Sequence, residues 1–113
     1  MSQITTHILD TALGKPAAGV AIELSQLQGN DWYAIGSGVT NNDGRIADLC
    51  PAGESLPAGT YRMHFATGDY FSGAGQAVFY PWADVVFSID DGGQHYHIPL
   101  LLSPYGYSTY RGS

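Results

Sequence analysis

The chain has 113 residues, and its four Lys or Arg against ten Asp or Glu give a formal net charge of −6. This length predicts one compact domain spanning residues 1–113, and the negative charge excludes the basic surface that nucleic-acid binding requires. No apolar run approaches the ~20 residues that span a bilayer, and we find no secretory signal at the start of the sequence. The single Cys50 cannot form an internal disulfide. We therefore expect a cytoplasmic protein that binds neither nucleic acid nor membranes.

Alternation of apolar and polar residues with a period of two predicts about eight short strands. We place them at residues 4–9, 20–27, 32–39, 45–49, 60–66, 84–90, 94–102 and 105–111. Turn-forming sequences rich in Gly, Asn, Asp or Pro separate them; they lie at 13–16, 41–44, 57–59 and 90–93. Residues 67–75 predict a single helical turn. The pattern is typical of an all-β antiparallel sandwich with at most one short helix.

His95 and His97 lie on the same face of the strand predicted at 94–102, because side chains two apart on a strand point the same way. From the residues alone this pair, with His7, can be a solvent-facing group, a general base or a zinc site. No cysteine pair, H-E-x-x-H motif or acidic cluster supports metal binding. Cys50 has no neighbouring His or Lys that would activate it, and no G-x-S-x-G elbow is present, so covalent catalysis is not indicated. Composition and spacing identify no reaction.

Three stretches add a family resemblance that covers essentially the whole chain. The first reads Thr-Thr-His-Ile-Leu-Asp at 5–10, the second Phe-Tyr-Pro at 79–81, and the third runs from His-Tyr-His at 95–97 to the C-terminal Ser-Pro-Tyr-Gly-Tyr-Ser-Thr-Tyr-Arg-Gly-Ser at 103–113. Together they resemble the 5-hydroxyisourate hydrolases, the transthyretin-related enzymes of urate breakdown. The terminal Tyr-Arg-Gly-Ser at 110–113 separates these hydrolases from transthyretin proper.

The resemblance implies a transthyretin-like sandwich of two four-stranded antiparallel sheets, assembled as a homotetramer with its sites where two dimers meet. The implied activity is hydrolysis of 5-hydroxyisourate to 2-oxo-4-hydroxy-4-carboxy-5-ureidoimidazoline, by opening of the six-membered ring at a cyclic amide. No cofactor and no metal are implied.

The same resemblance implies a set of site residues, matched position by position. The catalytic residues would be His7, Arg45, His97 and Ser113, with His97 as the base that activates water. The substrate-binding residues would be His7, Arg45, Tyr110 and Arg111. Two other functions remain open: a transthyretin-like carrier of small aromatic ligands in the same channel, and a zinc protein that uses His7, His95 and His97.

Overall fold

The computed structural model describes residues 3–46, 48–50, 55–90 and 93–112. In this part of the chain the strands form two four-stranded sheets and one short two-stranded sheet. The first four-stranded sheet has the order β5-β4-β6-β7, formed by β4 (Ala21–Gln28), β5 (Asp31–Val39), β6 (Gly59–Phe65) and β7 (Ala83–Ile89). The second has the order β10-β9-β2-β3, formed by β2 (Ile8–Asp10), β3 (Lys15–Pro16), β9 (Leu100–Ser103) and β10 (Gly106–Thr109). The two-stranded sheet pairs β1 (Ile4–Thr5) with β8 (Tyr96–His97).

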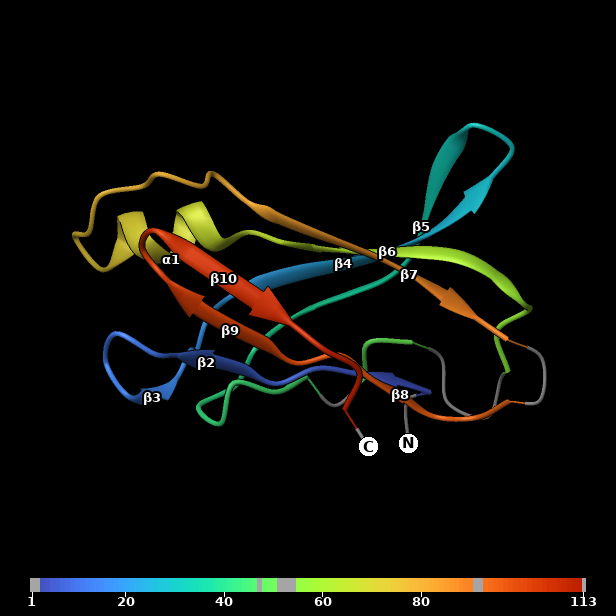
Figure 1. Ribbon diagram of the computed structural model, residues 1–113, viewed down its shortest axis with the longest axis horizontal. Coiled ribbons are helices and arrows are strands. Elements are labelled where there is room, and N and C mark those ends of the chain that lie inside the picture. The colour runs from blue at the N-terminus through green and yellow to red at the C-terminus, as the bar shows by residue number, and fades with distance from the viewer. Residues whose placement is uncertain (1–2, 47, 51–54, 91–92, 113) are drawn as a thin grey trace.

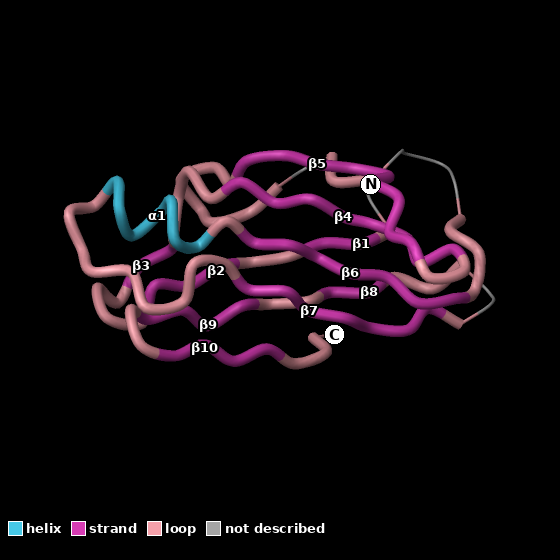
Figure 2. Tube along the Cα trace, turned by 90° about the horizontal axis from the view of Figure 1, so that it is seen from above, coloured by secondary structure: helices cyan, strands magenta, loops and turns pink. Residues whose placement is uncertain are grey.

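The two large sheets form separate layers, with β4 and β6 in one and β2, β3 and β9 in the other (Figure 1). Helix α1 (Thr67–Gly73) lies at one end of the sandwich, and β5 and β10 run along opposite edges (Figure 2). No helix in the described residues has the length and apolar character needed to cross a bilayer.

The core lies between the sheets, where alternate side chains of each strand meet. In the N-terminal segment Ile4, Thr6 and Ile8 are buried while Thr5 and His7 are only half-buried. The other core residues follow the same period of two on their strands; they include Ile22 and Leu24, Tyr61, Met63 and Phe65, and Leu100 and Leu102. This alternation places one face of each strand against the core and leaves the other face available for a site.

The predicted sandwich of two four-stranded sheets with one short helix is confirmed. Its strands pair antiparallel, except for β2 with β9 and β1 with β8, which pair parallel. The prediction of a strand at 45–49 was wrong, because Arg45 forms only an isolated bridge with His7. The residues that follow instead pack over β5, where Gly36 and Gly38 leave room for the Leu49 backbone and the Ile46 side chain.

The predicted strand at 94–102 is also divided, into β8 and β9, with Pro99 between them. Proline has no backbone N–H to donate to a neighbouring strand, so the ladder is interrupted there. The strand predicted at 4–9 is divided at the corresponding point, into β1, which pairs with β8, and β2, which pairs with β9. At the turn predicted for 13–16, the last two residues form β3, which pairs with Leu9 and Asp10.

Candidate functional site

The candidate site begins on the outward face of the N-terminal segment. Thr5 and His7 are two residues apart in extended backbone, so both side chains point away from the core. The buried Thr6 between them donates its hydroxyl to the carbonyl of Ile98, at 2.6 Å. This buried hydrogen bond fixes the segment against the strand that carries His97.

Arg45 reaches this face through a tight turn. The Asn41 side chain accepts hydrogen bonds from the backbone N–H groups of Asp43 and Arg45, at 2.9 and 3.1 Å. Gly44 adopts φ +73°, and a Cβ there would collide with the carbonyl of Ile8. The close approach lets the Ile8 N–H donate to the Gly44 carbonyl at 2.9 Å. The turn therefore holds Arg45 directly beside His7, with Nη2 of the arginine 3.3 Å from Nδ1 of the histidine.

His97 lies on the other side of Thr5. The two residues are paired in the parallel β1–β8 register, and the Thr5 hydroxyl is 2.8 Å from Nδ1 of His97. The same hydroxyl is 2.9 Å from Nε2 of His95, whose ring lies nearly parallel to that of His97 at 6.5 Å between centroids. Nδ1 of His97 is thus engaged by Thr5, and Nε2 is the ring nitrogen left for chemistry.

The C-terminal segment is placed by the register of the β9–β10 hairpin. Leu100 pairs with Thr109 in that hairpin, and the same register brings Gly112 opposite His97. The Gly112 N–H donates to the His97 carbonyl at 2.8 Å. Directly opposite residues of an antiparallel pair share one face, so Gly112 lies on the face that carries His97.

Gly112 meets His97 so closely that a side chain would not fit. A Cβ at Gly112 would lie 2.6 Å from Cδ2 of the His97 ring. The ring cannot easily move away, because Thr5 contacts it at Nδ1. Gly112 therefore packs directly against the Cγ–Cδ2 edge of the imidazole, opposite Nδ1.

The surroundings of His97 favour its neutral form. Partial burial lowers its pKa below the usual 6.5, and the positive charge of Arg45 lowers it further, as do His95 and His7 when they are protonated. A charged imidazole is disfavoured both by the loss of solvent and by nearby cations. His97 consequently remains a neutral, proton-accepting imidazole at lower pH than an ordinary histidine.

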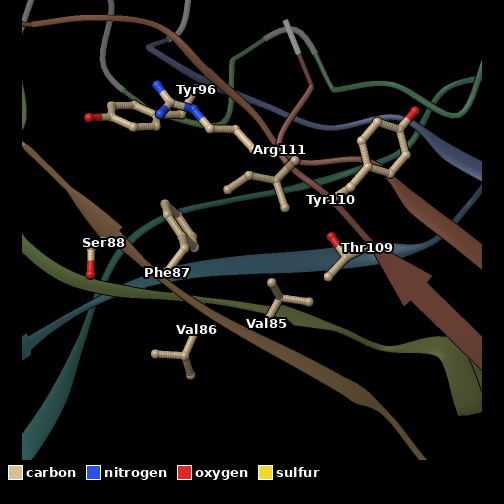
Figure 3. A pocket seen from close by; sticks show the side chains of 9 residues that line it. Val85, Val86, Phe87, Ser88, Tyr96, Thr109, Tyr110 and Arg111 are labelled. Carbon is tan, nitrogen blue, oxygen red and sulfur yellow. The ribbon is translucent and has the colours of Figure 1, made fainter.

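Tyr110 and Arg111 follow the end of β10, and both line one pocket between the terminal segment and β7. The Arg111 guanidinium lies 4.6 Å from the ring centroid of Tyr96, and its Nη2 donates to Gln94 at 3.2 Å. The pocket has a volume of about 230 Å³, and Figure 3 shows the Arg111 guanidinium stacked on Tyr96, with the Tyr110 ring pointing away from that pair.

The structure thus brings together His7, Arg45 and His97 from the predicted set, and places Arg111 outside that group. Ser113 lies outside the described residues. Within the described ranges, no three His, Cys, Asp or Glu side chains are grouped so that they could hold a metal ion. The Thr5 hydroxyl lies between His95 and His97.

Sequence reasoning missed two residues of this group, Thr5 and Gly112. Thr5 could have been found from its position two residues before His7 on the same strand. Gly112 could not, because its contact with His97 depends on the hairpin register.

Comparison with known proteins gives consistent results. A sequence profile described as the HIUase/Transthyretin family matches residues 4–112. The 5-hydroxyisourate hydrolase of Caulobacter vibrioides is 50% identical over 117 residues, covering 100% of both chains. Among solved structures, Klebsiella pneumoniae 5-hydroxyisourate hydrolase has a TM-score of 0.84 at 42% identity, covering 97% of this chain and 98% of that one. Sea bream transthyretin in complex with thyroxine has a TM-score of 0.92 at 37% identity, covering 98% of this chain and 95% of that one.

Proposed function

The chain belongs to the HIUase/Transthyretin family, and from this we infer that it hydrolyses 5-hydroxyisourate at the site around His97. The observation that carries the assignment to this site is the grouping of His97, whose pKa is lowered, with Arg45 and His7 beside Gly112. Hydrolysis of a cyclic amide requires a base for water, stabilisation of the developing oxyanion and a proton for the leaving nitrogen. The group supplies all three.

His97 is the base in this scheme. Its Nε2 takes a proton from water while the water oxygen forms a bond to the amide carbon. When the C–N bond of the ring breaks, the resulting imidazolium returns that proton to the leaving nitrogen, and neutral His97 is regenerated. The lowered pKa of His97 favours the first transfer because the residue is already neutral before substrate arrives.

Arg45 and His7 stabilise the negative charge that develops on the carbonyl oxygen. A guanidinium can only donate hydrogen bonds, so its contact with Nδ1 of His7 requires that nitrogen to be bare. Neutral His7 then carries its proton on Nε2 and is a hydrogen-bond donor. Two donors from neighbouring residues can therefore face one substrate oxygen, with the arginine contributing the positive charge.

The C-terminal segment completes the site. Tyr110 lies two residues before Gly112 and contacts the substrate ring in our proposal. Ser113, the residue after Gly112, would supply a hydroxyl to orient the water or a histidine. Arg111 anchors the segment through Tyr96 and Gln94 rather than touching substrate.

The exposure of this face supports a site shared between subunits. Arg45 and His95 are exposed, and His7 and His97 are half-buried. Electrostatic catalysis is stronger where bulk water is excluded, so a second surface that covers the site would favour the reaction. We propose that this surface comes from another subunit, in a homotetramer with its sites where two dimers meet, acting in cytoplasmic purine breakdown.

A carrier function is the alternative, because the sea bream relative is a transthyretin in complex with thyroxine. The fold alone does not separate the two functions. The two functions can be separated by mixing freshly generated 5-hydroxyisourate with a molar excess of the protein. An enzyme makes the ultraviolet absorbance of the substrate fall faster than it does by spontaneous decay. A carrier would leave that decay unchanged or slow it, and either result would exclude the hydrolase.

Arg45→Met is expected to raise the pKa of His97, because the substitution removes one of the positive charges that lower it. NMR titration of the His97 ring protons measures this directly. In the unaltered protein His97 should become protonated only below pH 6.5, and in the variant the midpoint should move up toward 6.5. Arg62→Met is the matched control, since Arg62 packs on Trp32 of the other sheet. A midpoint that stays in place or moves down in Arg45→Met would contradict this electrostatic account.

A further inference from the structure

The Thr5 hydroxyl contacts two histidine rings at once. Its Oγ1 is 2.8 Å from Nδ1 of His97 and 2.9 Å from Nε2 of His95. Both distances are those of good hydrogen bonds. This geometry follows from the fold, because Thr5 pairs with His97 in the β1–β8 register while His95 lies two residues earlier on the same face.

A hydroxyl has one proton to donate, whereas it can accept at its lone pairs. If both contacts are hydrogen bonds and both rings are neutral, Thr5 can donate to only one of the two ring nitrogens, so at least one ring carries its proton on the nitrogen that faces Thr5. Where the hydroxyl proton is also used within this group, Thr5 donates to one ring and accepts from the other. Either His97 then carries its proton on Nδ1 and His95 presents a bare Nε2, or both assignments are reversed.

Only the first arrangement suits the reaction. A neutral imidazole that acts as a base through Nε2 must carry its proton on Nδ1. Resting on the function proposed above, we propose that Thr5 is a positioning residue: it donates its proton to Nε2 of His95, accepts the Nδ1 proton of His97, and so leaves Nε2 of His97 free. His95 is the acceptor that makes this direction possible.

The arrangement also survives the reaction unchanged. When Nε2 of His97 takes a proton from water, Nδ1 keeps its own proton and still donates it to Thr5. Neither the threonine nor His95 has to move or change its protonation. On the opposite edge of the ring, Gly112 limits movement of the imidazole away from Thr5.

Imidazole ¹⁵N NMR of the substrate-free protein tests this without any turnover. At alkaline pH, where histidines are neutral, His97 is expected to be protonated on Nδ1 and bare on Nε2, and His95 to be bare on Nε2. Spectra of His95→Gln and His97→Asn assign the two rings. A His97 ring that carries its proton on Nε2 in the unaltered protein would overturn the proposal, whatever the catalytic rate.

Variants of Thr5 provide the second arm. Thr5→Val preserves shape and β-branching but removes the hydroxyl, so the His97 ring should become a mixture of tautomers and kcat should fall about ten-fold with little change in KM. Thr5→Ser should retain the tautomer and most of kcat, and Thr60→Val on β6 is the matched control for the substitution itself. An unchanged tautomer in Thr5→Val, or equal losses in the Val and Ser variants, would show that the hydroxyl has no such role. If neither the unaltered protein nor any variant hydrolyses 5-hydroxyisourate, the proposed function is wrong. The NMR measurement still decides which nitrogen of His97 carries the proton.

Discussion

Replacing His97 with alanine is expected to lower kcat for 5-hydroxyisourate by about 10²–10⁴-fold, the usual contribution of a general base. The loss should be in kcat rather than KM, because the proton transfer occurs only in the transition state. Stopped-flow measurement of the ultraviolet absorbance, with spontaneous decay subtracted, gives both constants.

Two further variants separate catalysis from folding. His97→Asn can keep a polar contact with Thr5 but has no basic nitrogen, so it should be as inactive as His97→Ala. His64→Ala is the matched control, since His64 pairs with Asp84 at 2.7 Å on the other sheet, and it should retain full activity. Near-normal turnover in His97→Asn with an unchanged melting temperature would remove His97 from the role of base.

The second large effect is expected at the chain terminus. Gly112→Ala should lower kcat about 10- to 100-fold, because the new Cβ would lie 2.6 Å from the His97 ring and displace either the imidazole or the terminal segment. Gly106→Ala is the matched control in the same hairpin, since a Cβ there meets nothing closer than the Ser103 hydroxyl oxygen at 3.8 Å.

Deletion of Ser113 should cause a comparable loss if the terminal residue belongs to the site, and so should a C-terminal tag that follows it. Activity equal to that of the unaltered protein in both Gly112→Ala and the Ser113 deletion would exclude the terminus from the active site.

Much of this site was predictable from local patterns. Alternation alone puts His95 and His97 on one face, and the Asn-Asn-Asp-Gly turn predicts that Arg45 leaves a tight bend. The family resemblance grouped Tyr110 with Arg111 as substrate-binding, and in the structure both line one pocket. Local patterns do not predict the structure correctly where a segment packs over the face of a strand instead of pairing with its edge. The segment after Arg45 was predicted as a strand, but Ile46 and Leu49 pack over Gly38 and Gly36 of β5.

The contacts that organise the catalytic groups were beyond local reasoning. Thr5 meets His97 through a parallel pairing of residues far apart in the sequence, and no pattern of period two specifies that register. The His7–Arg45 bridge likewise depends on the approach of the Gly44 turn to Ile8. These are tertiary relations, set by which strands become neighbours in the sandwich.

The most direct test of the account is the initial rate of 5-hydroxyisourate hydrolysis with catalytic amounts of protein. The substrate should be generated enzymatically immediately before mixing, and the buffer-only rate subtracted. We predict a rate that rises in proportion to protein concentration over many turnovers, and that disappears in His97→Asn at equal concentration. A rate indistinguishable from spontaneous decay, or one that His97→Asn leaves intact, would contradict hydrolysis at this site.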